Sequence, residues 1–501
     1  MIKAFGKIGY LRNHSLNINI DKGEKKMQPV KNTKMVCTIG PASEPREILE
    51  SLIDAGMNVM RLNFSHGDFE EHGGRIRTVK KIKEETGKEV AILLDTKGPE
   101  IRTGEFEGGV TQFTKGQTSV ICYEDVVGTS DRFSITYKDL YKDVIPGGVI
   151  LVNDGQVELR VEKVEGKDIV TTALNDGAVK NKRGINVPGI KLGFDYLSEK
   201  DIGDITFGCE MGINYVAASF VRRADDVKQV RALLDKNGRP DVQIIAKIEN
   251  SEGVENMDEI LEVADGIMVA RGDLGVEVPA EDVPLIQKEL IKKCNACGKV
   301  VITATQMLDS MQVNPRPTRA EVSDVANAIF DGTDAIMLSG ESAQGDYPWE
   351  AVSTMARIAK KTETALDHGS LFRKAERTAK HDDTDEAICM SVAEIANKFN
   401  VAAIVAFTES GRTAQRISRY RPCCPIIAAT PHEVTLKRLA INWGVHSVIC
   451  DPITKTDSMV PYAIELAKDF GVQPGEKILV TGGNPGQTGS TNFLNLVVAV
   501  K

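Results

Sequence analysis

Gln243-Ile-Ile-Ala-Lys-Ile-Glu249 and Gly266-Ile-Met-Val-Ala-Arg271 are two short apolar runs separated by an amphipathic segment. Short apolar strands that alternate with helices are typical of βα units around a parallel sheet. Eight such runs occur along the chain: Met35–Ile39, Asn58–Phe64, Val90–Asp95, Tyr215–Val221, Gln243–Glu249, Gly266–Arg271, Val300–Gln306 and Ala335–Ser339. Eight units are the number that closes a (β/α)₈ TIM barrel, whose functional side chains lie at the C-terminal ends of the strands. The sequence therefore predicts this α/β fold.

The series is interrupted after its third run, between about Gly98 and Phe194. This segment has glycine-rich turns and a strict alternation in which Val157, Leu159 and Val161 are separated by charged residues. Alternation with a period of two predicts antiparallel strands. We therefore expect an inserted antiparallel β-barrel domain over residues 98–194, placed to act as a lid over the mouth of the barrel.

A second pattern of alternating helices and strands begins after about Asp367, with a helix expected at Ala387–Phe399 and a strand at Val401–Phe407. This pattern predicts a C-terminal open α/β domain over residues 367–501. Residues 1–31 are polar, basic and without periodicity, which predicts a flexible tail. The barrel itself is then expected to comprise residues 32–97 and 195–366.

Chain length and net charge limit the number of domains and the classes of partner that we expect. A chain of 501 residues suggests roughly three domains. Lys and Arg together number 62 and Asp and Glu 71, for a net charge of −9, which argues against a nucleic-acid partner. No apolar run approaches the roughly 20 residues of a membrane helix, and no apolar leader is present. We therefore expect a protein without a membrane partner.

The nine cysteines are an odd number scattered over a long chain, which fits reduced thiols in the cytoplasm better than a disulfide framework. Cys294 and Cys297 have metal-ligand spacing, but no second pair follows, so an ordinary helical pair is favoured over a zinc site. Cys423 and Cys424 are adjacent and flanked by prolines, and they are assigned no function.

Charged side chains occupy the C-terminal ends of two neighbouring predicted strands. Lys247 and Glu249 lie two residues apart and share one strand face. A lysine that points into a barrel is costly unless it is paired or functional, so a structural ion pair and a reactive site are the two interpretations. Asp273 follows the next strand, and two converging carboxylates suit Mg²⁺. The neighbouring Gly272 would let a substrate approach the backbone closely.

The ends of three other predicted strands are also polar. Arg61, Asn63 and Ser65 alternate with apolar residues along the second strand, and Asp95 ends the third. Thr305 lies at the end of the seventh, although Thr also simply favours strands. Buried polar groups need partners, and a bound cation or phosphate would supply them.

Several common signatures are absent from the sequence, namely the P-loop, the dinucleotide-binding glycine motif, HExxH and GxSxG. If phosphates are handled, barrel residues and metal ions must therefore handle them. In the C-terminal unit, Ser410-Gly411-Arg412-Thr413 lies between a strand and a helix. This segment is either a phosphate cradle or a plain helix cap with a surface arginine.

Seven blocks in order closely resemble the pyruvate kinase family. They are Cys37-Thr-Ile-Gly-Pro-Ala-Ser43, Met60-Arg-Leu-Asn-Phe-Ser-His-Gly67, Leu94-Asp-Thr-Lys-Gly-Pro-Glu-Ile-Arg-Thr-Gly104, Ile245-Ala-Lys-Ile-Glu-Asn250, Ala270-Arg-Gly-Asp-Leu-Gly275, Ala304-Thr-Gln-Met-Leu308 and Leu338-Ser-Gly-Glu-Ser342. The resemblance implies the last step of glycolysis, in which the phosphoryl group of phosphoenolpyruvate moves to ADP, giving pyruvate and ATP.

The resemblance also implies roles for the residues at the strand ends. Glu249 and Asp273 would hold Mg²⁺ or Mn²⁺, and Lys247 would stabilise the transferring phosphoryl group and the enolate. Arg61 would bind phosphate. The pyruvate portion would contact Gly272, Asp273 and Thr305, and Thr305 acting through water is a candidate proton donor to the enolate.

A monovalent site, a nucleotide site and an effector site are implied in the same way. The K⁺ ligands would be Asn63, Ser65, Asp95 and the carbonyl of Thr96. Glu100 is the acidic residue that accompanies K⁺ dependence, and a Lys there would replace the ion. The nucleotide would contact Asn63, His66, Arg102 and Arg183, the last at a position where many members have Lys. A phosphorylated effector would bind Ser410, Gly411, Arg412 and Thr413, and the assembly would be a homotetramer.

Two other functions remain open at this level. A metal-dependent barrel lyase or aldolase acting on pyruvate enolates would share the metal carboxylates but not the nucleotide and K⁺ contacts. A catalytically inactive barrel that serves as a binding protein would lack some active-site group. Every group that can be placed is present, so phosphoryl transfer is favoured over both.

Overall fold

The computed structural model describes residues 31–379, 383–484 and 491–500. The predicted tail therefore lies outside the described residues, apart from Lys31. The side chain of Lys31 is buried and donates hydrogen bonds to Thr33 O and Asn58 Oδ1.

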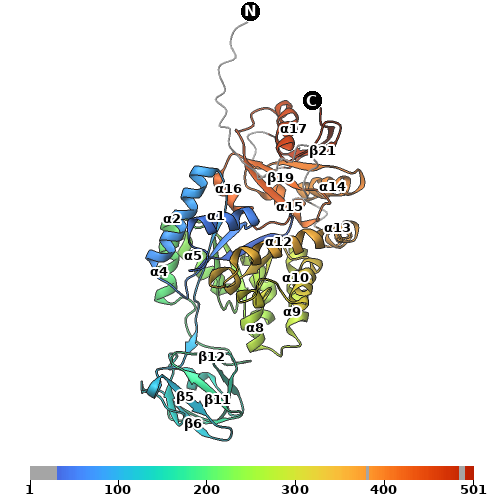
Figure 1. The fold of residues 1–501 in the computed structure, drawn as a ribbon. Coiled ribbons are helices and arrows are strands. Elements are labelled where there is room, and N and C mark those ends of the chain that lie inside the picture. The colour runs from blue at the N-terminus through green and yellow to red at the C-terminus, as the bar shows by residue number, and fades with distance from the viewer. Residues whose placement is uncertain (1–30, 380–382, 485–490, 501) are drawn as a thin grey trace, which may run out of the picture.

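Eight parallel strands form a closed barrel in the middle of the molecule (Figure 1). Each of the eight predicted runs overlaps one of them. The strands are β1 (Lys34–Thr38), β2 (Val59–Asn63), β3 (Ala91–Asp95), β13 (Tyr215–Ala218), β14 (Gln243–Ile248), β15 (Gly266–Ala270), β16 (Val300–Ala304) and β17 (Ala335–Leu338). β1 pairs with both β2 and β17, which closes the ring and confirms the predicted fold.

Helices surround this barrel (Figure 1). They are α1 (Arg46–Ala55), α2 (Phe69–Thr86), α4 (Glu199–Glu210), α5 (Ala224–Lys236), α6 (Ser251–Glu255), α7 (Met257–Val263), α8 (Arg271–Glu277), α9 (Val283–Cys297), α10 (Arg319–Asp331), α11 (Gly340–Ala343) and α12 (Pro348–Glu363), with a 3₁₀ turn η2 (Asp309–Gln312). Local sequence defines several of their starts. Ser198 with Asp201 and Thr318 with Glu321 form capping boxes at the starts of α4 and α10.

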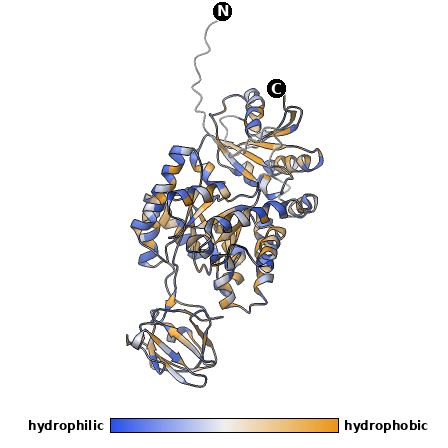
Figure 2. Ribbon diagram, viewed as in Figure 1, coloured by the Kyte–Doolittle hydropathy of each residue, from blue (hydrophilic) through white to orange (hydrophobic). Residues whose placement is uncertain are grey.

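Both faces of the barrel strands are buried, which explains why they read as continuous apolar runs. Along β1, Val36 belongs to the interior cluster, whereas Met35 and Cys37 pack in the layer between the strands and the helices. Figure 2 shows the same strands as predominantly hydrophobic. The apolar runs in the sequence therefore correspond to strands that are buried on both faces.

The insertion between β3 and β13 folds as a separate β unit at the bottom of Figure 1. It contains β4 (Ile101–Arg102), η1 (Glu107–Gly109), β5 (Val110–Phe113), β6 (Thr118–Cys122), β7 (Arg132–Ser134), α3 (Leu140–Asp143), β8 (Val149–Val152), β9 (Val157–Glu165), β10 (Asp168–Ala173), β11 (Gly177–Lys180) and β12 (Gly184–Asn186). Seven strands pair in the order β4-β12-β8-β9-β10-β6-β7, and β11 pairs with β5. All pairings are antiparallel except β6 with β7.

The unit has its own apolar core, in which Val157, Leu159 and Val161 of β9 are buried while the residues between them are exposed. Two segments connect it to the barrel. On the first, Gly98 has φ +72° and lies so close to Ser219 that a Cβ would clash. The second contains Leu192 and Phe194, whose carbonyl oxygens accept hydrogen bonds from buried Arg222 of the barrel. Both connections are therefore held by residues that follow the C-terminal end of β13.

The C-terminal unit is an open α/β sheet, at the top of Figure 1. Its elements are α13 (His368–Glu376), α14 (Thr384–Lys398), β18 (Ala403–Phe407), α15 (Arg412–Arg419), β19 (Ile426–Thr430), α16 (Glu433–Arg438), β20 (Val445–Ile449), η3 (Thr456–Ser458), α17 (Met459–Asp469), β21 (Lys477–Gly482) and β22 (Phe493–Val498). The strand order is β20-β19-β18-β21-β22. The first four strands are parallel, and β22 is antiparallel to β21.

The C-terminal unit also closes the base of the barrel. Ile441 is buried in the interior cluster of the barrel strands. Lys34, at the start of β1, donates to Val445 O over 2.5 Å, and Arg421 forms a buried ion pair of 2.8 Å with Asp334. The end of the barrel opposite the C-terminal unit therefore remains for a site.

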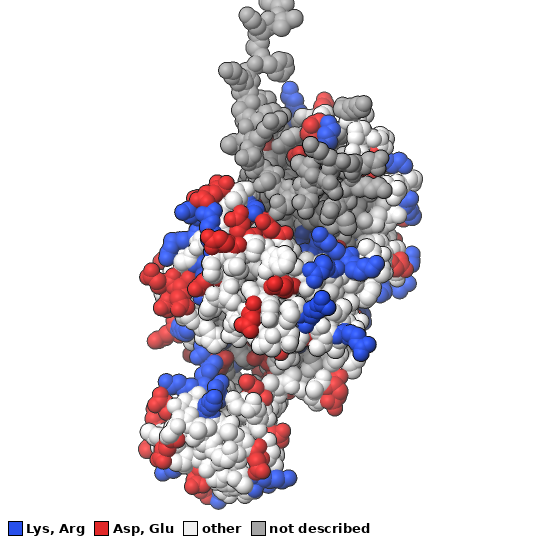
Figure 3. Space-filling model, viewed as in Figure 1, with Lys and Arg blue, Asp and Glu red and all other residues white. Residues whose placement is uncertain are grey.

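In the described part of the chain, no helix combines the length and the hydrophobicity that crossing a membrane requires. All nine cysteines are described and are free thiols, and Cys294 and Cys297 lie in α9. No group of three or more His, Cys, Asp or Glu side chains with metal-binding geometry occurs among the described residues. Acidic and basic side chains are interspersed on the face drawn in Figure 3.

Candidate active site

The predicted site residues converge at the C-terminal ends of the barrel strands. Lys247 lies near the end of β14, and Glu249 is the first residue after that strand. Asp273 lies in the first turn of α8, which begins where β15 ends. Lys247 is 8% exposed and Glu249 is fully buried, whereas Asp273 is exposed. The strand ends thus combine buried charge with an accessible carboxylate.

The Lys247 ammonium group is held by two carboxylates. Its Nζ lies 2.8 Å from Glu249 Oε1 and 3.1 Å from Asp95 Oδ1, and it donates a hydrogen bond of 2.8 Å to Ser219 Oγ. Burial alone would lower the pKa of Lys247, but the charges of Asp95 and Glu249 outweigh it and raise that pKa. Lys247 is therefore a buried, permanent cation.

Glu249 is the residue best suited to hold a metal ion. Its Oε2 accepts a hydrogen bond of 2.6 Å from the Phe220 amide, and its buried Oε1 contacts the Lys247 ammonium at 2.8 Å. Burial is the main cause that raises the pKa of Glu249, to about 8, and the nearby Asp273 charge adds to it. A divalent cation would compensate the charges of Glu249 and Asp273, so this oxygen donor set fits Mg²⁺ or Mn²⁺.

Arg61 and Asp95 form the second charged pair of the site. Arg61 Nε lies 2.6 Å from Asp95 Oδ2, and one terminal nitrogen donates to Thr38 Oγ1 over 2.8 Å. Burial would raise the pKa of Asp95, but Arg61 and Lys247 together hold it below its usual range. Asp95 therefore links the two cations that sequence reasoning placed on different strands.

The predicted K⁺ ligands lie on adjacent strand ends, because Asn63 and Asp95 are register partners of β2 and β3. Asn63 Oδ1 accepts a hydrogen bond of 3.1 Å from the Ser65 amide, and Thr96 O accepts one of 2.6 Å from Ser219 Oγ. Amide, hydroxyl, carbonyl and carboxylate oxygens are hard ligands of the kind that K⁺ takes. Both Asp95 oxygens already contact Arg61 or Lys247, so an ion here would share that carboxylate.

Ser219 was missed by sequence reasoning. It follows β13 directly, is buried, and contacts Lys247 Nζ, Thr96 O and, over 3.1 Å, Asp95 Oδ1. The rule that polar residues at strand ends form the site applies to it as well. Its position directly after the fourth barrel strand was the signal that could have identified it.

Thr305 and Gly272 are brought together as predicted. Gly272 N donates to Thr305 Oγ1 over 2.8 Å, and that hydroxyl donates to Ala304 O. Thr305 has φ +67°, which is unusual for a β-branched residue. Arg271, which was not predicted as a site residue, holds this turn by donating to Thr305 O and Ala304 O. Several donors therefore stabilise the strained turn at the mouth.

The predicted nucleotide residues are divided between the two sides of the site. His66 is exposed beyond the end of β2, and its carbonyl lies 2.8 Å from His72 Nε2. Arg102, on β4, donates to Glu100 Oε2 over 2.8 Å and to Lys182 O. Arg183 precedes β12, the antiparallel partner of β4. Arg102 and Arg183 thus belong to the inserted unit, whereas His66 belongs to the barrel.

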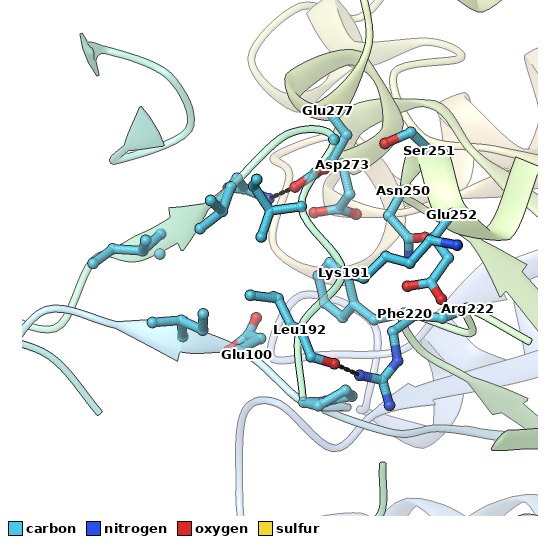
Figure 4. Close-up of a pocket in the computed structure, with 18 of the residues that line it drawn as sticks. Glu100, Lys191, Leu192, Phe220, Arg222, Asn250, Ser251, Glu252, Asp273 and Glu277 are labelled. Atoms are coloured by element: carbon cyan, nitrogen blue, oxygen red, sulfur yellow. Dashed lines mark hydrogen bonds between the residues drawn. The ribbon is translucent and has the colours of Figure 1, made fainter. Parts of the chain in front are cut away.

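A pocket separates these two units and extends to Asp273 (Figure 4). Phe220 and Asn250 line its barrel side, and Glu100 lines it from the connection to the insert. Asn186 of the insert donates a hydrogen bond of 2.8 Å to Glu277 of α8, which ties the two walls together.

The predicted effector segment lies in the C-terminal unit, at the start of α15. Gly411 has φ +87° and its amide donates to Thr408 Oγ1. Arg412 is exposed, with a nitrogen 3.6 Å from Asp383 Oδ2. The Thr413 hydroxyl is buried and lies 2.7 Å from Thr491 Oγ1. Ser410 and Arg412 are thus the more accessible polar side chains of this segment.

Comparison with known proteins identifies the family. The family model "Pyruvate kinase, barrel domain" matches residues 30–352, and "Pyruvate kinase, alpha/beta domain" matches residues 386–497. A pyruvate kinase of Geobacillus stearothermophilus is 55% identical over 93% of this chain and 80% of its own length. Those of Bacillus licheniformis (53%, over 94% and 80%) and Clostridium acetobutylicum (50%, over 94% and 100%) are also similar. These matches favour a phosphotransferase over a barrel lyase, and the chain belongs to the pyruvate kinase family.

Proposed function

We propose that the cluster around Lys247 is where the phosphoryl group of phosphoenolpyruvate passes to ADP, giving pyruvate and ATP. The observation that carries this proposal is a buried ammonium, Lys247, held between the buried carboxylates of Glu249 and Asp95 at the strand ends. Phosphoryl transfer requires alignment and compensation of negative charge more than covalent help from the protein. Lys247 and Arg61 would compensate that charge on the phosphoryl group and on the enolate oxygen.

Glu249 and Asp273 would hold the divalent ion, which when bound would supply positive charge that stabilises the transferring phosphoryl group. The oxygen donors of Asn63, Ser65, Asp95 and Thr96 would hold K⁺. The pyruvate portion would lie against Gly272, Asp273 and Thr305, where the hydrogen bond from Gly272 N holds the Thr305 hydroxyl at the mouth. Thr305 would position a water that protonates the enolate carbon.

ADP would lie between the barrel and the insert, in contact with Asn63, His66, Arg102 and Arg183. The insert would act as a lid that excludes water during transfer. The hydrogen bond from Asn186 to Glu277 supports this role, because it joins the insert to α8 of the barrel, the helix that carries Asp273.

The decisive assay is pyruvate formation from phosphoenolpyruvate and ADP. We expect turnover that requires ADP and a divalent ion, and that stops when the ion is removed by a chelator. Cleavage of an enolate substrate without ADP would instead favour a lyase. Metal binding without turnover, even with sugar phosphates added, would favour an inactive barrel.

We also propose that a phosphorylated effector, a sugar phosphate or a nucleotide, binds at Ser410, Gly411, Arg412 and Thr413. The exposed Arg412 guanidinium at a helix start supports this site, because both its charge and the free amides there attract phosphate.

Replacing Arg412 with Ala should abolish activation by such an effector and leave the rate at saturating phosphoenolpyruvate unchanged. Titrating sugar phosphates and nucleotides at low substrate concentration measures this. Lys398→Ala, an exposed side chain on α14, is the matched loss of charge and should retain activation. An activation curve that is the same for Arg412→Ala and the unmodified enzyme would place the effector elsewhere.

The remaining proposals concern organisation. The domain boundaries 32–97 with 195–366, 98–194 and 367–501 are supported by apolar clusters that are largely separate for the barrel, the insert and the C-terminal unit. A homotetramer is proposed from the family and is tested by light scattering of the purified enzyme. A cytoplasmic location fits the nine free thiols.

A further inference from the structure

A second histidine lies close to His66, the barrel residue that the proposed function places against ADP. His66 is exposed in the turn between β2 and α2, residues 64–68. His72 lies near the start of α2 and is only 2% exposed. The mechanism proposed above assigns nothing to His72. Because a buried polar ring needs hydrogen-bond partners, its contacts show what it does.

The His72 ring packs closely against this turn. Its Nε2 lies 2.8 Å from His66 O, and the ring stacks on Phe64 with the centroids 4.1 Å apart. The Phe64 amide donates to Asp95 O over 2.9 Å, which joins the start of the turn to the end of β3. Gly67 has φ +75°, and a Cβ there would lie 3.2 Å from His72 Nε2. Three residues of the turn thus lie against one buried ring.

The partners of His72 determine which ring nitrogen carries the proton. A carbonyl oxygen only accepts, so Nε2 donates to His66 O. Arg75 Nη1 lies 3.4 Å from Nδ1, and because a guanidinium only donates, Nδ1 accepts. Arg75 is itself held by Glu44 Oε2, at 2.9 Å from Nε and 2.8 Å from Nη2. Burial is the main cause that lowers the pKa of His72, and the Arg75 charge adds to it, which favours this neutral form.

We propose that His72 is a positioning residue for ADP, which acts through His66. The hydrogen bond from Nε2 fixes the His66 backbone, and the stack on Phe64 fixes the strand end that precedes it. The His66 side chain is then presented to the nucleotide from an ordered turn, so less conformational entropy is lost when ADP binds. This inference rests on the proposed contact between His66 and ADP.

The test is the equilibrium binding of MgADP to the full-length protein, measured by titration calorimetry without phosphoenolpyruvate. His72→Met and His72→Gln are a matched pair, because the two side chains have similar length and only Gln carries a donor at the ε position. We expect His72→Met to raise the dissociation constant about fivefold, the effect of losing one hydrogen bond, and His72→Gln to change it by less than about twofold. His368→Met removes a contact of 2.8 Å between a histidine ring and Arg421 O in the C-terminal unit, and it should leave MgADP binding unchanged.

Hydrogen exchange reports on the turn directly. The amides of residues 65–68 should exchange faster in His72→Met than in the unmodified protein, because the turn opens more often without its hydrogen bond. In His72→Gln their exchange should stay slow. Equal exchange in His72→Met and the unmodified protein would show that the ring does not order the turn, and it would overturn the proposal.

His66→Ala separates this inference from the proposed function. In that background His72→Met should have little further effect on MgADP binding, because no His66 side chain remains to be positioned. If the two losses add, or if His66→Ala weakens binding and a folded His72→Met does not, His72 does not act through His66. If His66→Ala leaves binding unchanged, the nucleotide contact of His66 is wrong and the inference fails with it, while the assignment of Lys247 stands.

One comparison does not depend on the folding of His72→Met. A folded His72→Gln protein that binds MgADP as weakly as His66→Ala would show that a donor at this position is not what matters, and it would overturn the proposal. Circular dichroism of each variant verifies the fold before binding is measured.

Discussion

Lys247→Met lowers kcat for phosphoryl transfer by about 10³-fold or more. Methionine keeps the length and apolar stem of the side chain but removes the cation that lies 2.8 Å from Glu249 and 3.1 Å from Asp95. The loss falls on the transition state, where charge on the phosphoryl and enolate oxygens develops without a compensating ammonium. Steady-state pyruvate formation with saturating phosphoenolpyruvate, ADP and Mg²⁺ measures it.

Two controls separate loss of chemistry from loss of fold. Lys292→Met removes an exposed ammonium from α9 and should leave kcat unchanged. Circular dichroism should show that Lys247→Met retains the fold, because Arg61 still pairs with Asp95. A folded Lys247→Met enzyme with a kcat within tenfold of the unmodified one would refute the role proposed for this lysine.

Glu100→Lys makes turnover independent of K⁺. In the unmodified enzyme, exchanging K⁺ for tetramethylammonium should lower kcat by about 10²-fold, because one fixed positive charge at the strand ends is lost. Glu100 now pairs with Arg102 at 2.7 Å and with Lys97 at 3.7 Å. A lysine would be repelled by both and would present its ammonium toward the oxygens of Asn63, Ser65, Asp95 and Thr96. Measuring pyruvate formation in each salt, with Mg²⁺ present, tests this.

Glu105→Lys is the matched control, since it makes the same charge reversal at an exposed position of the insert. It should keep the full K⁺ requirement. If Glu100→Lys were active only in K⁺, or if the unmodified enzyme were indifferent to K⁺, the monovalent site would be wrong while the phosphoryl transfer assignment would stand.

Much of the architecture could be predicted because it depends on short-range patterns. Strands buried on both faces are largely apolar, so the barrel strands are evident as runs such as Ala335–Leu338. The insert is buried on one face of its strands, so β9 alternates. Strand β22 was not predicted. It lies at the sheet edge, and all six of its residues are partly exposed or exposed without strict alternation, so its pattern is weak.

The candidate site could be predicted in part for the same reason. Lys247 and Glu249 stood out because charged residues interrupt an apolar strand at its end. Ser219 did not stand out, since a serine after a strand is also an ordinary turn residue. The contacts of Asp95 could not be predicted either. Its partners Arg61 and Lys247 lie 34 and 152 positions away in the sequence, and no local period links them.

The sequence by itself determined the α/β barrel, the position of the insert, and the set of charged residues at the strand ends. These follow from periodicity and from the rule that parallel strands present their C-terminal ends on one side. Only the tertiary structure decided that Asp95 joins Arg61 to Lys247 and that the Phe220 amide holds the second oxygen of Glu249. It alone showed that Ile441 closes the base of the barrel. Such contacts arise when distant segments pack, and their geometry depends on the closed ring rather than on any local pattern.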